Sequence, residues 1–543
     1  MKRTALFIAL ALGLNTYAQE FTKADSLRGM MRLERACFDV NYYHINIDFD
    51  LDQRSLDGYV DMHFEVKKPS RTIQVDLYRN MQLDAVKWGN MDLNYRRIED
   101  AVFVDFPSHL RVGSTQMIRM HYKGNPTVAK NAPWDGGFVF KKDKAGKHFV
   151  GVACEGDGAS LWWPNKDHLS DEPDSLRLTG TVPADLMLVA NGNLEEEVLM
   201  GDRKQFTWKV SYPINNYNVS VNIADYAHFS DKYKSSDGDV LALDYYVLKE
   251  NLAKAKEQFK QVKPMLNIFE AYFGKYPFWN DGFALVETPY LGMEHQSAIA
   301  YGNGYLPGYR GMHPPEMDFD YIIIHETGHE YWGNHVSMKD ISDMWIHESF
   351  CTYSEAVFVE AKYGPDKVDD YLNYQKAFIS NASPIKGVEG MNHHGNSTDM
   401  YYKGSWMLHS LRNTIANDKL WWNCLRDVQK TFGMKTIDGD QLIKYISNYF
   451  DKNLEPIFNQ YLKHTDIPSL EYKLNKSWGK TTLVYRWNCS ESDFNMPMDL
   501  LVGGEEIRIY PTNFWQEIEF KKTKPADFEF LINKFLFKLS PVE

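Results

Sequence analysis

Hydrophobic and polar residues alternate strictly from residue 43 to residue 52, which predicts a β-strand with one buried face. The apolar side of this strand is Tyr43, Ile45, Ile47, Phe49 and Leu51. After a turn predicted near residues 55–58, the alternation resumes from Val60 to Val66, so the pair is expected to form a hairpin in an antiparallel sheet. Short strand-like runs continue to about residue 224. The first region is therefore predicted to be all-β.

The pattern changes to helical spacing near residue 250. Residues 251–272 are rich in Lys, Ala, Glu and Gln, and helical patterns dominate to about residue 464. One stripe, Leu442, Ile446, Tyr449 and Phe450, is typical of core packing. Strand-like runs return beyond Pro468. A chain of 543 residues is too long to fold around one compact core. We therefore expect a multidomain α+β fold with regions at 19–226, 227–464 and 465–543.

Residues 1–18 are typical of a signal peptide. Lys2 and Arg3 precede an apolar run from residue 5 to residue 14, and small residues follow near Ala18. We expect export, a mature chain that starts at Gln19, and a soluble periplasmic or extracellular location. The apolar run is shorter than the ~20 residues that span a bilayer, so no integral membrane segment is expected.

Charge and cysteine content narrow the classes of partner. Loss of the two basic residues with the signal peptide takes the formal net charge from −13 to −15, which disfavours nucleic acid and anionic membranes. The five cysteines lie far apart, without the paired spacing of a zinc ribbon or a redox motif. The sequence leaves disulfide pairing and oligomeric state open.

The candidate chemistry begins at residues 325–329, which read HETGH and match an HExxH motif. Positions i and i+4 share one face of a helix, so His325 and His329 can bind one zinc ion, with Glu326 beside it as general base. The alternative is a surface helix that happens to carry two histidines. A catalytic zinc site needs a third protein ligand and an open position. Glu348 follows His329 after eighteen intervening residues, on a second predicted helix, and is the expected third ligand.

An HExxH motif followed by eighteen residues and Glu resembles the zinc signature of the M1 family of gluzincin aminopeptidases. Residues 291–295 read LGMEH and are similar to the GxMEN exopeptidase motif of that family. The resemblance implies one Zn²⁺ per chain and a substrate-binding segment at Gly292, Met293 and Glu294, in which Glu294 binds the free ammonium group. This sequence departs from the motif at His295, where the family has Asn, and at Leu291, where it has Gly.

Two further segments extend the resemblance. In residues 154–173, Glu155 matches a second amine-binding carboxylate of the family. Residues 401–404 read YYKG and resemble a YxKG segment whose first tyrosine donates a hydroxyl to the oxyanion, which makes Tyr401 a candidate catalytic residue. Glu155 as an ordinary loop acid, and Tyr402 in place of Tyr401, are the alternatives.

The resemblance implies an N-terminal β saddle, a thermolysin-like α/β catalytic domain and a small C-terminal β sandwich, as a short form without the large helical domain of many members. It also implies an aminopeptidase that hydrolyses the first bond of peptides with a free N-terminus, by metal-activated water and Glu326. An endopeptidase, or an inactive peptide-binding relative of the same fold, is the alternative.

Overall fold

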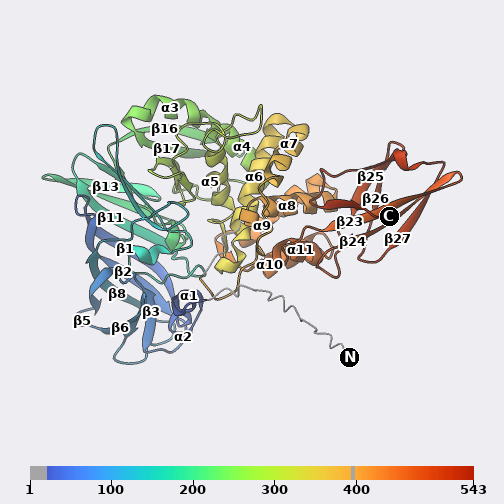
Figure 1. Ribbon diagram of the computed structural model, residues 1–543. Coiled ribbons are helices and arrows are strands. Elements are labelled where there is room, and N and C mark those ends of the chain that lie inside the picture. The colour runs from blue at the N-terminus through green and yellow to red at the C-terminus, as the bar shows by residue number, and fades with distance from the viewer. Residues whose placement is uncertain (1–20, 393–397) are drawn as a thin grey trace, which may run out of the picture.

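The computed structural model describes residues 21–392 and 398–543, and it places β-rich parts on both sides of a mainly helical part (Figure 1). The expected multidomain α+β class is confirmed. The predicted signal peptide lies outside the described residues. No helix in the described ranges is long and apolar enough to cross a membrane.

The N-terminal part begins with two short helices and continues as β-strands to residue 224. An eight-stranded sheet has the order β13-β14-β11-β1-β2-β8-β4-β5, and smaller sheets lie beside it. The elements are α1 Lys23–Gly29, α2 Leu33–Ala36, β1 Phe38–Asp50, β2 Ser55–Val66, β3 Thr72–Asp76, β4 Met81–Trp88, β5 Met91–Asp92, β6 Asn94–Ile98, β7 Ala101–Asp105, β8 Thr115–Gly124, β9 Gly137–Lys142, β10 His148–Ala153, β11 Ser175–Pro183, β12 Met187–Val189, β13 Asn193–Met200, β14 Arg203–Val210 and β15 Asn222–Ala224.

The first hairpin forms with its turn earlier than expected. The turn occupies residues 51–54, whereas the predicted turn at 55–58 belongs to β2. Asp50 Oδ1 accepts a hydrogen bond from Gln53 N at 2.9 Å, and Arg54 has a φ of 53°, so this tight turn closes without glycine. Gly58 instead pairs with Ile47 inside the sheet, where a Cβ would lie 2.0 Å from the Asn46 carbonyl oxygen. A close approach between strands therefore explains this glycine.

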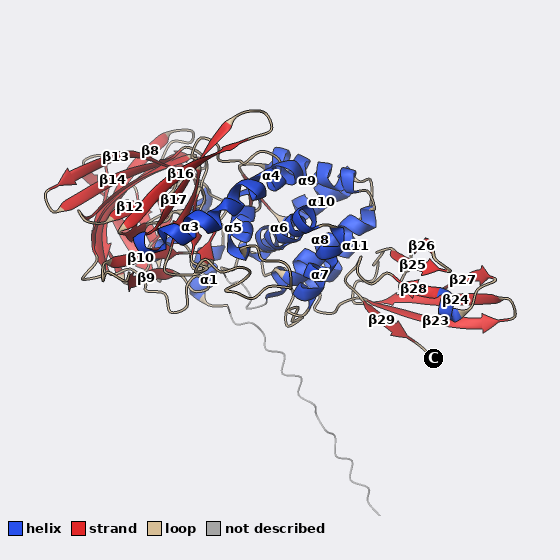
Figure 2. Ribbon diagram, turned by 90° about the horizontal axis from the view of Figure 1, so that it is seen from above, coloured by secondary structure: helices blue, strands red, loops and turns tan. Residues whose placement is uncertain are grey.

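The central part combines a five-stranded sheet with helices, as Figure 2 shows. The sheet has the order β16-β17-β18-β20-β19, which leaves β19 at an edge. Its elements are β16 Tyr226–Lys234, β17 Val240–Leu248, α3 Leu252–Gln258, α4 Val262–Phe273, β18 Phe283–Glu287, β19 Gly292–Met293, β20 Ala298–Tyr301, α5 Tyr321–Tyr331, β21 Val336–Met338, α6 Trp345–Tyr363, α7 Pro365–Lys376, α8 Tyr402–Ile415, α9 Asp418–Phe432, β22 Lys435–Ile437, α10 Gly439–Tyr449 and α11 Glu455–Lys463. In the predicted stripe, Leu442 and Ile446 are fully buried.

The C-terminal part contains two small sheets, with the orders β27-β24-β23-β29 and β26-β25-β28. The strands are β23 Ser469–Ser477, β24 Lys480–Asn488, β25 Met498–Val502, β26 Glu505–Ile509, β27 Gln516–Lys521, β28 Phe528–Phe530 and β29 Lys538–Pro541. Apolar side chains of these strands, such as Leu470 and Leu500, belong to one continuous core with the central helices. Contact through this core fixes the C-terminal sheets to the helical part.

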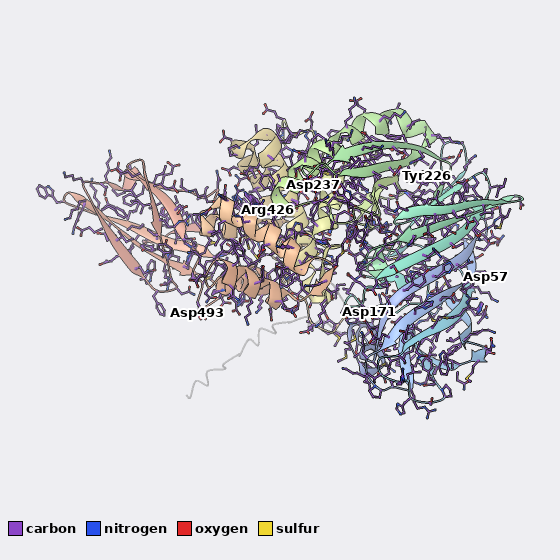
Figure 3. The ribbon with its side chains drawn as sticks, turned by 180° about the vertical axis from the view of Figure 1, so that it is seen from behind. Asp57, Asp171, Tyr226, Asp237, Arg426 and Asp493 are labelled. Atoms are coloured by element: carbon purple, nitrogen blue, oxygen red, sulfur yellow. The ribbon has the colours of Figure 1, made fainter. Side chains whose placement is uncertain are left out.

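A second large core fills the N-terminal β part and reaches across to the central sheet. It includes Val286, Met293 and Ala300, which lie on β18, β19 and β20. Figure 3 shows Asp171 on the side of the N-terminal part that faces the helices. Burial of apolar surface on both sides therefore holds the edge strand β19 against the N-terminal part.

Candidate active site

Helix α5 carries the HExxH residues and presents them on one buried face. The helix begins at Tyr321 because Asp320 caps it, accepting a hydrogen bond from Ile322 N at 3.1 Å. His325 and His329 are one turn apart, and their Nε2 atoms are 3.2 Å apart. Both side chains are buried, although imidazole is a polar group that normally finds a partner inside a protein.

Helix α6 packs against α5 and places Glu348 opposite the two histidines. Its Oε2 lies 3.4 Å from His325 Nε2 and 3.5 Å from His329 Nε2. This oxygen is buried and accepts no hydrogen bond from the described residues. Tetrahedral zinc, with bonds of about 2.0 to 2.2 Å, holds neighbouring ligand atoms roughly 3.3 to 3.6 Å apart. The three predicted ligands therefore fit a zinc ion by chemistry and by spacing.

Glu355, about two turns beyond Glu348 on α6, orients the first histidine. Its Oε1 lies 2.7 Å from His325 Nδ1, and its Oε2 accepts a hydrogen bond from Tyr371 OH at 2.6 Å. A carboxylate on Nδ1 holds the ring so that Nε2 is free to bind a metal. The sequence analysis missed Glu355. Its position seven residues after Glu348, on the same helix, is the signal that identifies it.

His347 belongs to the support of the site. Its Nε2 accepts a hydrogen bond from Met338 N at 2.9 Å, which ties α6 to β21. Ligand atoms of Glu294, His329 and His347 nevertheless also lie within 4.8 Å of one another, as do those of His325, His329 and Glu348. The set His325, His329 and Glu348 is favoured, because Nε2 of His347 already accepts the hydrogen bond from Met338 N.

Glu326 lies in the cavity beside the edge strand β19. At Gly292 on this strand, an added Cβ would lie 2.6 Å from Glu326 Oε1 and 2.8 Å from Ile322 Cγ2. Only glycine allows the strand to approach the helix so closely. Burial raises the pKa of Glu326 to about 8, with His325 and His329 acting against the shift. A cation held by the neighbouring ligands would favour the ionised carboxylate that a general base needs.

Two more carboxyl groups, Glu294 and Glu155, face the same cavity. Glu294 Oε1 accepts a hydrogen bond from Tyr217 OH at 3.0 Å. Glu155 Oε1 is buried, and no hydrogen bond to it is found in residues 21–392 and 398–543. Burial raises the pKa of Glu155 well above its usual range, and the charges of Glu294 and Glu348 raise it further. Two buried acids side by side are complementary to a cation.

Tyr217 and Asn334 position Glu294, and no sequence motif points to either residue. Asn334 Nδ2 donates to the Glu294 carbonyl oxygen at 2.8 Å, and Asn218 Nδ2 donates to Asn334 Oδ1 at 2.7 Å. His295, which departs from the family motif, is fully buried outside the cavity lining, and burial lowers its pKa to about 3. A neutral His295 therefore adds no charge beside Glu294.

Tyr401 caps α8 and points its hydroxyl at the ligand set. The Tyr401 OH donates to Glu348 Oε1 at 3.2 Å, the oxygen that does not face the histidines. Tyr402 also lines the cavity, but its contact is with the ring of Phe378 at 5.3 Å. The structure thus places the Tyr401 hydroxyl, as the sequence motif predicts, next to the ligands.

The predicted site residues line one cavity of about 380 Å³, a volume that accommodates a short peptide segment. They are Glu155, Gly292, Met293, Glu294, His325, Glu326, His329, Glu348 and Tyr401. Apolar and aromatic residues form the rest of the wall, including Trp134, Leu291, Tyr309, Met344 and Met400. Such a lining of apolar wall and few convergent polar groups is typical of a ligand site.

Comparisons with known proteins agree with this geometry. Residues 257–461 match the model of the Peptidase family M1 domain. An M1 zinc metallopeptidase from Deinococcus radiodurans, solved as a mutant bound to the substrate Tyr-Ser-Ala, has a similar fold with a TM-score of 0.66. It is 19% identical, and the alignment covers 80% of this chain and 96% of that one.

The curated relatives are longer than this chain. Tricorn protease-interacting factor F2 from Thermoplasma acidophilum is 22% identical over 58% of this chain, which spans 38% of that protein. Leucyl aminopeptidase from Saccharolobus solfataricus is 19% identical over 80% of this chain, which spans 55% of it. The chain therefore spans about half or less of the length of these relatives.

Proposed function

We propose that this chain, whose residues 257–461 match the model of the Peptidase family M1 domain, is a zinc-dependent aminopeptidase of that family. The observation that carries the proposal is the pair of acids, Glu155 and Glu294, beside the His325, His329 and Glu348 set in one cavity. The pair offers a buried anionic site for the ammonium group of a peptide. The ligand set lies where the next peptide bond would reach.

Each residue of the site has a separate role in peptide hydrolysis. Zinc, when bound by His325, His329 and Glu348, supplies Lewis acidity that polarises a carbonyl group and lowers the pKa of water towards ~7. Glu326 accepts the proton of the attacking water and passes it to the leaving nitrogen. Gly292 makes room for the Glu326 carboxylate, as its close approach shows.

Tyr401 stabilises the negative charge that develops on the carbonyl oxygen. Its hydroxyl is already directed to the ligand set by the bond to Glu348 Oε1, so little reorganisation is needed. Glu294 and Glu155 bind the free ammonium group and thereby set the cut after the first residue. Met293 lines the same cavity, where a bound peptide would contact it.

An endopeptidase would use the same metal and base but has no need for an ammonium site. The decisive experiment compares one peptide with a free and with an acetylated N-terminus. We expect acetylation to abolish cleavage nearly completely, and a chelator to abolish the cleavage of the free peptide. Glu294→Ala should lower kcat/KM for the free peptide about 30-fold to several-thousand-fold, because a buried ionic contact contributes ~2 to 5 kcal/mol.

Internal cleavage of the acetylated peptide at the rate of the free peptide would replace the aminopeptidase with an endopeptidase. Binding of peptide without any cleavage, with zinc present, would support an inactive peptide-binding relative.

The proposal includes export to the periplasm or the extracellular space. Lys2, Arg3 and the apolar run that follows support it. N-terminal sequencing of the protein purified from culture tests this point. We expect a chain that starts at Gln19, and retention of Met1 would contradict export by signal cleavage.

A further inference from the structure

The loop that carries Glu155 contains two glycines in four residues. It reads Glu155-Gly156-Asp157-Gly158 between β10 and the short 3-10 helix Ala159–Leu161, and both glycines have left-handed backbone angles, with φ of 77° and 83°. Glycine loses more conformational freedom on folding than any other residue. The position of the Glu155 carboxylate therefore depends on contacts that hold this loop from outside.

Arg28, on the N-terminal helix α1, supplies one of these contacts. Its Nη2 donates to the Asp157 carbonyl oxygen, and its Nη1 donates to Tyr78 OH at 3.1 Å. Tyr78 OH in turn donates to the same Asp157 oxygen at 3.1 Å. At Gly158 an added Cβ would lie 2.4 Å from Arg28 Nη2. The guanidinium thus packs directly on the loop, and its side chain is only 12% exposed.

Asn392 supplies a second contact to the loop. Its Nδ2 donates to the Gly156 carbonyl oxygen at 3.1 Å, and its backbone N donates to the Asp25 carbonyl oxygen at 3.1 Å. Helix α1 is itself pressed against this segment, because a Cβ at Gly29 would lie 2.5 Å from the Gly390 carbonyl oxygen. Two consecutive carbonyl groups of the Glu155 loop are therefore held by two distant parts of the chain.

Helix α1 is fixed to the body of the protein independently of the loop. Leu27 is buried against Ala101 and Phe103, and Gln74 Nε2 donates to the Leu27 carbonyl oxygen at 3.0 Å. Figure 1 shows α1 at the side of the N-terminal part that faces the central helices. Arg28 therefore joins the anchored helix α1 to the loop that carries Glu155.

We propose that Arg28 is a positioning residue for Glu155, and that α1 anchors the loop that carries this substrate-binding residue. The inference rests on the proposed function, because it assigns Glu155 to the ammonium group of the peptide. Peptide affinity then depends on a residue of the N-terminal segment that touches neither substrate nor metal.

The test is a double-mutant cycle on the full chain with a free-amine peptide. We expect Arg28→Ala to raise KM about tenfold with zinc content unchanged, since a charge-assisted hydrogen bond that orders the loop is lost. Arg28→Lys should recover part of this loss. In a Glu155→Gln background, Arg28→Ala should have no further effect on KM, because the two residues then act as one unit.

Arg32→Ala is the matched control, since Arg32 is exposed in the same segment and its side chain donates only to Ser26 and Met30 in the described contacts. It should leave KM unchanged. If Arg28→Ala does not fold, Asn392→Ala replaces it, with a smaller rise in KM that is also absent in the Glu155→Gln background.

Three results would overturn the proposal: an unchanged KM in Arg28→Ala, a rise in KM that persists in full without Glu155, or a Glu155→Gln variant identical to wild type. Wild-type protein that cleaves no free-amine peptide would instead overturn the proposed function, and this inference with it.

Discussion

The metal-binding half of the cavity and its proposed amine-binding half are built in different ways. His325, His329 and Glu348 come from α5 and α6, two helices that follow one another in the chain and pack in one core. Glu155 and Glu294 come from a loop after β10 and from the end of β19, and Tyr217 reaches Glu294 from a third segment. The first half is local in sequence, whereas the second exists only where two parts of the protein meet.

The two halves of the site should therefore differ in how they respond to changes elsewhere in the molecule. The geometry of α5 holds His325 and His329 one turn apart, and α6 packs against α5 and brings Glu348. The metal half should therefore tolerate changes elsewhere in the molecule. The amine half depends on how the N-terminal part sits against the central sheet, through side chains such as Asn334 and Tyr217. Loss of turnover should therefore follow changes in the first half, and loss of affinity should follow changes in the second.

The largest effect should come from the ligands themselves. His325→Ala, His329→Ala and Glu348→Ala are each expected to lose zinc and all measurable turnover, because three protein ligands are the minimum of a catalytic site. His347→Gln is the control and should keep zinc, since His347 bonds to Met338 N. Metal analysis and kcat on the same samples measure both. Loss of zinc in His347→Gln with full zinc in Glu348→Ala would favour the other ligand set.

Glu326→Gln should come next. The amide keeps the shape of the side chain but cannot accept a proton, so kcat is expected to fall by ~10² to 10⁴ while zinc remains bound. Gly292→Ala offers a second way to disturb the same group, because its methyl would displace Glu326 Oε1. Near-normal kcat in Glu326→Gln with zinc present would remove Glu326 from the mechanism.

Tyr401→Phe tests the remaining group on the metal side. Loss of one oxyanion donor typically lowers kcat by about 10² to 10³, and KM should change little. Tyr402→Phe is the matched control, and its kcat should stay within a few-fold of wild type, because Tyr402 packs against Phe378. A larger loss in Tyr402→Phe than in Tyr401→Phe would exchange the roles of the two residues.

The smallest effect is expected on the amine side, from Tyr217→Phe. Removal of the hydroxyl takes one hydrogen bond from Glu294 but leaves its charge, so kcat/KM should fall roughly 3- to 10-fold, mainly through KM. The same change should not alter the slow cleavage of an acetylated peptide. A fall in kcat alone would mean that the two halves of the site are coupled more closely than their separate construction suggests.

The fold could be predicted from the sequence in outline. Alternation gave the buried face of β1, with Tyr43, Ile45 and Ile47 fully buried, and helical spacing gave the central helices. The first turn forms four residues earlier than predicted, because Gly58 is part of strand β2 and not of the turn. Its true role is contact with the neighbouring strand, and such contact between strands leaves no mark on the local pattern. The domain boundaries at residues 226 and 464 stay predictions.

The sequence by itself determined the metal half, since one helical turn separates His325 from His329 and the next helix brings Glu348. Tertiary structure decided the rest. Glu155 is 139 residues from Glu294 in the chain, yet the two carboxyl groups line one cavity. Burial raises the pKa of Glu155, and the charge of Glu294 raises it further. Periodicity reports only which face of an element is buried, and not which distant element lies against it. The packing of the N-terminal part on the edge strand β19, and of α1 on the Glu155 loop, supplies that missing information.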